Sequence, residues 1–174
     1  MRQKVMVFIL IGMPGCGKSC MGKAVSRKLG LRHVDSDRII ERRYGKKLSE
    51  LIEELGVDEF KRIEKETLLS MKLDNVVFST GGSAVYYPEA MEHLKSFGAV
   101  VYLYCSYDII AERIGDFSRR GVVMNEGQTL RELYDERAEL YKRYADVTVD
   151  CSGRDYSKYR SRVFSVMKYM METQ

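Results

Sequence analysis

The sequence has few of the residues from which disulfide frameworks and metal clusters are built. Its 174 residues include only four cysteines, at positions 16, 20, 105 and 151, and two histidines. The cysteines form no CxxC pair and show no metal-ligand spacing with histidine. Domains that depend on disulfides are short and dense in cysteine, so we expect reduced thiols and a cytoplasmic protein.

Long hydrophobic runs are also absent, because no apolar stretch approaches the ~18–20 residues needed to cross a membrane. We therefore expect no association with a membrane. A short apolar run at residues 5–11 follows Arg2 and Lys4 and resembles a secretion signal. It leads directly into a glycine-rich loop, however, and cleavage of a signal there would remove the strand that supports the loop.

Neither sign of charge predominates in the chain. Lysine and arginine number 29 and aspartate and glutamate 25, which leaves a net charge of +4. This excess is too small to indicate a nucleic-acid partner, but it suits an anionic small ligand. Hydrophobic residues make up 45% and charged residues 31% of the chain, the usage of a folded globular protein. We expect a single domain over residues 1–174, and a monomer.

Proline is rare, and Pro14 and Pro88 both lie between expected elements. Apolar runs rich in valine and isoleucine predict strands at residues 4–11, 31–35, 75–79, 99–104 and 147–150. Helical spacing predicts helices at residues 18–29, at residues 36–73 with breaks near Gly45 and Gly56, from Pro88, from Thr129 and in the C-terminal stretch. Strands that alternate with helices predict an α/β fold with a five-stranded parallel sheet flanked by helices.

The strongest signal is the octapeptide GMPGCGKS at residues 12–19, which matches G-x-x-x-x-G-K-[ST] in full. Glycines let backbone N–H groups converge on phosphate oxygens, and the N-terminus of the following helix adds a favourable dipole. We expect Lys18 to reach the β- and γ-phosphates and the Ser19 hydroxyl to coordinate Mg²⁺. The predicted nucleotide-binding residues are Gly12, Gly15, Cys16, Gly17, Lys18, Ser19 and Cys20.

This phosphate loop indicates ATP or GTP and phosphoryl transfer or hydrolysis. The chain has no N-K-x-D motif for reading guanine, which favours ATP. We interpret the thiols of Cys16 and Cys20 as passengers without a redox role.

Two acidic residues follow the second expected strand. Ligands of open α/β sheets bind at the carboxyl ends of the strands, where Asp35 and Asp37 lie. One carboxylate there can hold Mg²⁺ through water, and the other can accept a proton from a substrate hydroxyl. Capping of the next helix by Ser36 or Asp37 is an alternative interpretation that is compatible with the first.

Two further segments carry candidate acceptor-binding groups. Phe60 lies on the core face of an expected helix. For the neighbouring Lys61 and Arg62, one interpretation is that one of them points into the cleft, and the other is that both are solvated. Gly81 and Gly82 follow the third strand and form either a backbone nest for an anion or hydroxyl, or a plain turn.

A polar, glycine-containing stretch without periodicity, at about residues 115–128, is a candidate mobile lid. Thr129 to Glu132 then form a capping-box sequence at the start of a helix. Arg137 falls on the apolar stripe of that helix, where a charge is costly unless it is paired. Two interpretations of Arg137 are open: it forms a structural ion pair, or its side chain points into a cleft that binds an anionic ligand.

Taken in order and with their spacing, these motifs resemble the shikimate kinases, small P-loop kinases related to the nucleoside monophosphate kinases. The resemblance extends from Gly12 to about Asp150. The matching features are the phosphate loop, the D-x-D of Asp35 and Asp37, the helix with Phe60 and Glu64, the Gly81-Gly82 turn, and Glu136-Arg137 followed by Leu140-Tyr141 and Ala145-Asp146.

The resemblance implies a P-loop NTPase fold with a mobile lid and a substrate-binding helical region at about residues 36–64. It implies a kinase that transfers the γ-phosphate of ATP to the 3-hydroxyl of shikimate, in the biosynthesis of aromatic amino acids, with Mg²⁺. Asp37 would then contact the reacting hydroxyl, Asp35 would be associated with Mg²⁺, and Arg137 would bind the shikimate carboxylate.

The remaining roles also follow from the resemblance. Gly81 and Gly82 would contact the substrate, and Lys61 would bind its carboxylate. Arg120 in the lid, together with Lys18, would stabilise charge on the transferred phosphoryl group.

The chain departs from the family pattern around the acceptor and the lid. Lys61 stands where the family usually has arginine, Ser83 stands where it has a third glycine, and Gly121 follows Arg120 where it has proline. Lysine is a point charge that cannot grip a carboxylate with two parallel hydrogen bonds. These departures leave open a different hydroxy-acid acceptor, such as homoserine.

Two other functions also stay open. A nucleotide kinase could bind an acceptor phosphate with Arg119, Arg120 and Arg137, although Asp35 and Asp37 would repel a phosphate. A non-catalytic nucleotide-binding module would leave the lysine and serine of the phosphate loop and both aspartates without a task.

Overall fold

The computed structural model describes residues 6–115 and 121–173. Its centre is a five-stranded sheet in the order β2-β3-β1-β4-β5, in which all neighbouring strands are parallel. The strands are β1 (Val7–Ile11), β2 (Arg32–Asp35), β3 (Val76–Ser79), β4 (Ala99–Tyr104) and β5 (Val147–Asp150). The predicted α/β fold with five parallel strands is confirmed.

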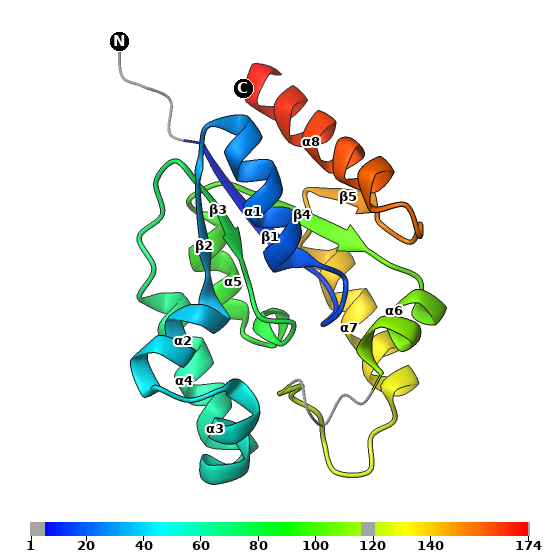
Figure 1. Cartoon of the computed structure of the whole chain (residues 1–174). Helices are drawn as coiled ribbons and strands as arrows, with labels where there is room; N and C mark the ends of the chain where they lie inside the picture. The colour runs from blue at the N-terminus through cyan, green and yellow to red at the C-terminus, as the bar shows by residue number, and fades with distance from the viewer. Residues whose placement is uncertain (1–5, 116–120, 174) are drawn as a thin grey trace.

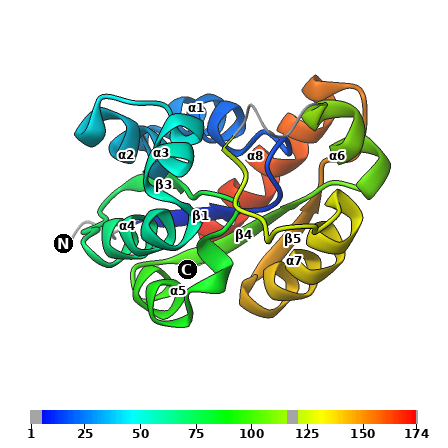
Figure 2. The same cartoon turned by 90° about the horizontal axis from the view of Figure 1, so that it is seen from below.

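Helices cover both faces of this sheet (Figures 1 and 2). One face carries α1 (Lys18–Leu29) and α8 (Tyr156–Thr173), and the other carries α4 (Val57–Leu69), α5 (Pro88–Lys95) and α7 (Leu130–Tyr144). The remaining elements are α2 (Ser36–Tyr44), α3 (Leu48–Leu55), the 3-10 turn η1 (Ala84–Tyr86) and α6 (Tyr107–Ile114). The 3-10 turn was not predicted from the sequence.

Strand β1 occupies the centre of the sheet because its residues are apolar on both faces. Ile9 lies between Phe78 of β3 and Val100 of β4, and all three side chains are fully buried. Parallel strands need crossover connections, which place helices on both faces and bury the central strand completely. The continuous run of valine, isoleucine and leucine in β1 is therefore what this position requires.

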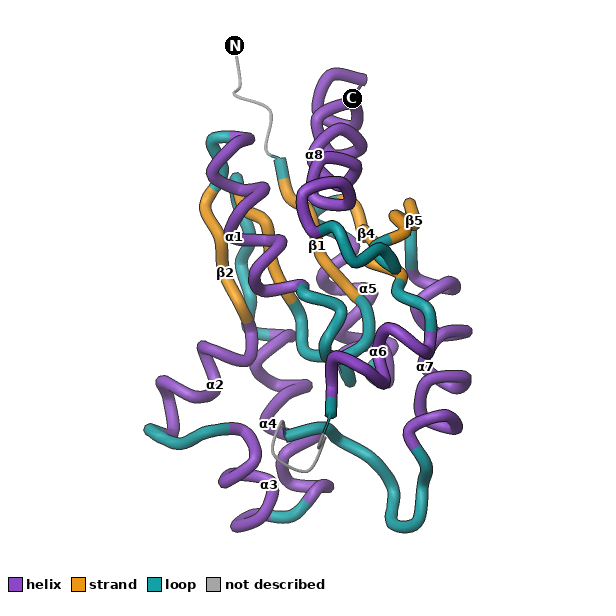
Figure 3. Tube along the Cα trace, turned by 45° about the vertical axis from the view of Figure 1, so that its right-hand side comes forward, coloured by secondary structure: helices purple, strands orange, loops and turns teal. Residues whose placement is uncertain are grey.

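The parallel arrangement brings three polar loops to one edge of the sheet. The phosphate loop follows β1, Asp37 follows β2 and the Gly81-Gly82 turn follows β3, each at the carboxyl end of its strand. Helices α2, α3 and α4 lie beyond this edge on one side, and the segment that leads into α7 lies on the other side (Figure 3). The opposite edge of the sheet carries none of these loops.

A small second cluster of apolar side chains holds the helical region together. Its buried members are Ile40, Leu51, Phe60, Ile63 and Val123. Val123 comes from the stretch expected to form the lid, and it is 3% exposed against the helices α2 to α4. Val123 is thus packed against the predicted substrate-binding region.

Several element boundaries differ from the expectation. β1 begins at Val7, and residues 4 and 5 of the expected strand lie outside the described residues. The predicted helical region extended to residue 73, but α4 ends at Leu69. β3 begins one residue late because Asn75 has a φ of 47°, a left-handed conformation that ends the extended backbone. None of these shifts moves a site residue to another element.

The sequence also predicted that the chain does not associate with a membrane and that it forms a single domain. None of the helices within residues 6–115 and 121–173 is long and apolar enough to cross a membrane. The assignment of residues 1–174 to a single domain stays a prediction.

The start of α7 provides a test of stability that is independent of the active site. Thr129 Oγ1 accepts a hydrogen bond from the Glu132 N–H at 3.2 Å, and Glu132 Oε2 accepts one from the Thr129 N–H at 2.8 Å. Thr129→Ala should lower the free energy of unfolding by about 1 kcal/mol, because this capping bond is lost. Urea denaturation measures the change as a lower midpoint at unchanged slope.

The matched control is Thr173→Ala, which removes an exposed hydroxyl that donates to the Tyr169 carbonyl in the last turn of α8. This variant should unfold within about 0.5 kcal/mol of the original protein. Equal losses in the two variants would contradict the role of Thr129 as a cap.

Candidate active site

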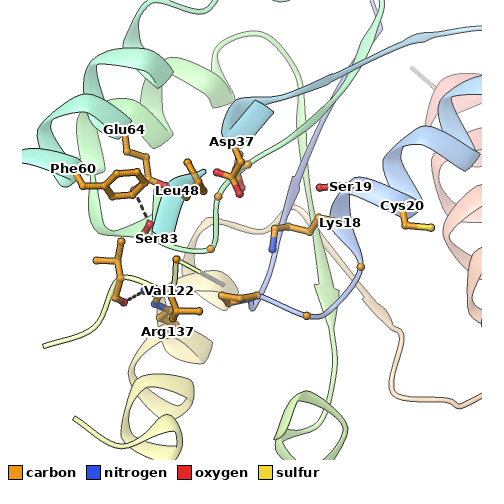
Figure 4. Close-up of a pocket in the computed structure, with 18 residues that line it drawn as sticks. Lys18, Ser19, Cys20, Asp37, Leu48, Phe60, Glu64, Ser83, Val122 and Arg137 are labelled. Atoms are coloured by element: carbon orange, nitrogen blue, oxygen red, sulfur yellow. Dashed lines mark hydrogen bonds between the residues drawn. The ribbon is translucent and has the colours of Figure 1, made fainter. Parts of the chain in front are cut away.

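A cavity of about 400 Å³ opens at the carboxyl edge of the sheet (Figure 4). Its lining residues come from the phosphate loop with the start of α1, from α2, α3 and α4, from the turn after β3, and from the segment before α7 together with α7. The fold therefore gathers groups that are more than a hundred residues apart in the sequence. Lys18, Asp37 and Arg137 all line this cavity.

The phosphate loop has the conformation that its glycines permit. Gly15 and Gly17 have φ of +84° and +93°, in the left-handed region that favours glycine. A Cβ on Gly12 would lie 2.7 Å from the Leu103 carbonyl oxygen, so this position has no room for a side chain. Gly17 is the N-cap of α1 and offers no side-chain capping bond, so the first N–H groups of α1 are available to an anion.

Five of the seven predicted nucleotide-binding residues line the cavity, and the other two are buried within the loop. The lining ones are Gly15, Gly17, Lys18, Ser19 and Cys20. Gly12 and Cys16 are buried and do not belong to the cavity lining formed by the described residues.

The Lys18 ammonium group lies over the backbone of the loop. Its Nζ donates to the carbonyl oxygens of Gly12 at 2.7 Å and Met13 at 3.0 Å. Both partners are neutral, so the positive charge of Lys18 remains available to an anionic ligand in the cavity.

The structure brings the two predicted metal ligands together. Ser19 Oγ donates to Asp35 Oδ2, although the two residues belong to α1 and β2. The other oxygen of Asp35 accepts from the backbone N–H groups of Asp37 at 3.0 Å and Arg38 at 3.3 Å. The alternative interpretation, in which Ser36 or Asp37 caps α2, is wrong: Asp35 is the N-cap, because its backbone is still extended and its side chain reaches forward.

Asp37 lies on the wall of the cavity in a position that disfavours its charge. Burial, first, and the nearby carboxylates of Glu64 and Asp35 raise the pKa of Asp37 to about 7, although Lys18 acts in the opposite direction. A carboxylate with a pKa close to neutral is suited to accept a proton from a hydroxyl group.

Arg137 is 1% exposed and has no carboxylate partner among the described residues. Its Nη2 donates to the Val123 carbonyl oxygen, and its Nε donates to the Tyr86 hydroxyl at 3.3 Å. The guanidinium also lies over the Tyr86 ring, 5.1 Å from the ring centre. The alternative of a structural ion pair is therefore not what the described residues form, and a buried cation faces the cavity.

Gly81 and Gly82, which follow β3, let neighbouring side chains pack directly against the backbone of the turn. A Cβ on Gly81 would come within 3.0 Å of both Glu64 Oε1 and Asp37 Oδ1, and a Cβ on Gly82 would lie 2.7 Å from the Pro14 ring. The Gly81 N–H already donates to Ser36 Oγ at 3.0 Å. The turn therefore brings α2, α4 and the phosphate loop together, and the Gly81 N–H is not free to bind an anion.

Two further predicted residues, Arg62 and Lys61, are absent from the cavity lining formed by the described residues. Arg62 is exposed and pairs with Glu59 and Glu66 on the surface of α4, as the solvated interpretation predicted. Lys61 is half-buried, and it is not part of the cavity lining formed by the described residues. Arg120 lies outside the described residues.

One residue of the cavity wall and two residues that contact the wall were missed in the sequence. Glu64 had been noted only as a match to the family, yet it is fully buried on the apolar face of α4. Its spacing from Phe60 gave the same signal that singled out Arg137, a charge at a position of the core stripe. Tyr86 and Tyr87, which contact Arg137 and Glu64, gave no signal because tyrosines at a turn are ordinary.

Comparisons with known proteins give a consistent result. The family model for shikimate kinase matches residues 14–168. A shikimate kinase of Clostridium botulinum (strain Eklund 17B / Type B) is 42% identical over 135 residues, which cover 77% of this chain and 81% of that protein. A shikimate kinase of Thiobacillus denitrificans is 37% identical over 144 residues, which cover 81% of this chain and 79% of that protein.

Solved structures agree with these relatives. The shikimate kinase from Acinetobacter baumannii in complex with shikimate superposes with a TM-score of 0.84 at 27% identity, covering 98% of this chain and 96% of that one. The shikimate kinase from Aquifex aeolicus gives a TM-score of 0.78 at 28% identity, covering 94% and 96%.

Gly81 permits a test of the close approach seen in this site. Gly81→Ala places a methyl group against two carboxylate oxygens, so we expect the free energy of unfolding to fall by about 1–3 kcal/mol. Gly153→Ala is the control, because its Cβ would meet nothing closer than 3.9 Å. The control should be neutral or slightly stabilising, by up to about 1 kcal/mol. Urea denaturation of both variants measures the difference, and equal stabilities would contradict the predicted crowding.

Proposed function

The chain belongs to the shikimate kinase family, and we propose which of its residues transfer the γ-phosphoryl group of ATP to a hydroxyl group of shikimate. The enzyme is a phosphotransferase with an alcohol group as acceptor. The observation that carries the proposal is a single cavity in which the phosphate loop, Asp37 and Arg137 face one another. The family assignment favours shikimate over homoserine and over a nucleotide as the acceptor.

The phosphate loop binds the triphosphate of ATP. The free N–H groups at the start of α1 and the left-handed glycines form a cradle for phosphate oxygens. Lys18 is held by carbonyl groups of the same loop, so its ammonium group is positioned beside the phosphates before they bind. This preorganisation reduces the cost of placing the cation at the transferred group.

Ser19 and Asp35 are proposed to hold Mg²⁺. A hydroxyl and a carboxylate oxygen are in direct contact there, and both are oxygen donors of the kind that Mg²⁺ prefers. Mg²⁺ usually binds through one or two protein groups together with the phosphates, and when bound it neutralises charge on them.

Asp37 and Arg137 act on the acceptor. We propose that Arg137 binds the carboxylate of shikimate, because the planar guanidinium can donate two parallel hydrogen bonds and forms no ion pair with an acidic side chain among the described residues. Asp37 then orients the reacting hydroxyl group and accepts its proton, as its raised pKa allows. The acceptor oxygen is placed for in-line attack on the γ-phosphate held by the loop.

Residues of the segment before α7 cover the acceptor. Val122 and Val123 line the cavity, and their apolar side chains exclude water from it. Exclusion of water suppresses hydrolysis of ATP. Roles for Lys61 and Arg120, a cytoplasmic location and a monomeric state stay predictions.

The direct test is release of ADP from ATP and Mg²⁺ by the purified chain with different acceptors. We expect turnover with shikimate that exceeds turnover with homoserine, gluconate or nucleoside monophosphates by at least about a hundredfold, since only shikimate pairs a carboxylate for Arg137 with a hydroxyl for Asp37 on a ring of the right size. Preferred turnover of another acceptor would show that Lys61 and Ser83 mark a changed substrate.

Asp37→Asn tests the proton acceptor. It removes the basic oxygen and keeps the size of the side chain, so kcat should fall by about 10²–10⁴-fold while the KM for ATP changes little. Asp58→Asn, at an exposed acidic residue in the first turn of α4, is the matched control and should keep kcat. A kcat for Asp37→Asn within a few-fold of the original enzyme would remove Asp37 from the proposed mechanism.

A further inference from the structure

Glu64 is a buried carboxylate that the reaction described above does not use. It lies on α4, lines the acceptor cavity and is fully buried. No lysine or arginine within residues 6–115 and 121–173 forms a direct ion pair with it, although Arg137 and Lys18 lie close enough to act on its charge. A buried charge without a counter-ion is strongly unfavourable unless hydrogen bonds replace the lost water. The protein must therefore supply those hydrogen bonds.

Two hydroxyl groups supply them, and both act on the same oxygen of Glu64. Ser83 Oγ donates to Glu64 Oε2 at 2.6 Å, and the Tyr87 hydroxyl donates to that atom at 2.7 Å. These lengths are typical of hydrogen bonds from hydroxyl groups to an ionised carboxylate. Burial raises the pKa of Glu64, and the two hydroxyl groups, followed by the charges of Arg137 and Lys18, act in the opposite direction. Ser83 and Tyr87 therefore favour the charged form and fix the rotation of the carboxylate.

The second oxygen of Glu64 faces the space beside Gly81. Glu64 Oε1 and Asp37 Oδ1 both lie within 3.0 Å of the point that a Gly81 Cβ would occupy. No donor among the described residues bonds to Glu64 Oε1. Figure 4 shows the Glu64 and Asp37 side chains on the same wall of the cavity. Two carboxylate oxygens that converge in this way suit two neighbouring hydroxyl groups of one ligand.

The backbone before α5 holds Tyr87 in place. Tyr87 joins η1 to α5, and Pro88 is the first residue of α5. Proline restricts the residue before it to extended conformations, and Tyr87 has φ −111° and ψ 90°. The side chain is buried as well, so its hydroxyl reaches Glu64 from a rigid support.

We propose that Ser83 and Tyr87 are positioning residues for the acceptor: by holding Glu64 Oε2, they keep Glu64 Oε1 directed at the hydroxyl group next to the one that is phosphorylated beside Asp37. This inference rests on the proposed function and deepens it. It assigns a task to two residues that take no direct part in phosphoryl transfer, and it predicts that the site favours an acceptor with adjacent hydroxyl groups.

Tyr87→Phe and Ser83→Ala each remove one hydroxyl group and keep the surrounding packing. Each should raise the KM for shikimate about tenfold, because Glu64 Oε1 is then no longer held toward the hydroxyl group of the substrate. The KM for ATP should stay within about twofold, since the phosphate loop is untouched. Tyr102→Phe is the matched control, because the buried Tyr102 hydroxyl has no hydrogen-bond partner in the described part of the chain. This control should leave both KM values unchanged.

A shikimate analogue distinguishes positioning of Glu64 from a purely structural role of Ser83 and Tyr87, because only positioning changes how strongly the enzyme discriminates against the analogue. In this analogue, hydrogen replaces the hydroxyl group next to the one that is phosphorylated. The original enzyme should lose about tenfold in kcat/KM on the analogue relative to shikimate. Tyr87→Phe should lose much less, because the oxygen that recognises this hydroxyl is no longer held in place. Ser83→Ala provides the same comparison if Tyr87→Phe folds poorly.

Three results would overturn the inference. These are an unchanged KM for shikimate in both variants, a parallel rise in the KM for ATP and shikimate, and an equal loss on the analogue in original and variant enzymes. An original enzyme that turns over no shikimate would overturn the proposed function and this inference together. If the original enzyme turns over shikimate and both variants keep its KM for shikimate, the inference fails and the proposed function stands.

Discussion

Three charged side chains are buried around one cavity, and much of the surrounding structure provides polar partners for them. Lys18, Glu64 and Arg137 come from α1, α4 and α7, and Asp37 lies half-buried on the same wall. Each charge has lost the water that would stabilise it, so the fold must replace that water with fixed dipoles. The parallel sheet makes this possible because it delivers the loops after β1, β2 and β3 to one edge.

The partners that the fold provides are neutral ones. Lys18 and Arg137 donate to backbone carbonyl groups, and Glu64 accepts from the hydroxyl groups of Ser83 and Tyr87. A cation held by a carbonyl oxygen keeps its full charge, whereas a cation paired with a carboxylate would be neutralised. The cavity can therefore attract an anion from two sides, with Lys18 near the phosphate loop and Arg137 near the acceptor.

The small apolar cluster around Phe60 couples the acceptor region to the segment before α7. Val123 contributes its side chain to this cluster and its carbonyl oxygen to Arg137. Arg137 therefore connects a bound carboxylate to the segment before α7, because its guanidinium also donates to the Val123 carbonyl oxygen. Ser83, which departs from the family pattern of three glycines, adds a hydroxyl group at the point where the buried Glu64 needs a donor.

The sequence by itself determined the sheet, the phosphate loop and the places of Asp35, Asp37 and Arg137, because periodicity and glycine spacing are local signals. Only the tertiary structure decided the partners of these residues. The N-cap by Asp35 depends on the conformation of one residue, and the contacts of Glu64 with Ser83 and Tyr87 join positions about twenty residues apart. Such contacts arise from the packing of α4 against the turn after β3, and no local pattern of residues encodes that packing.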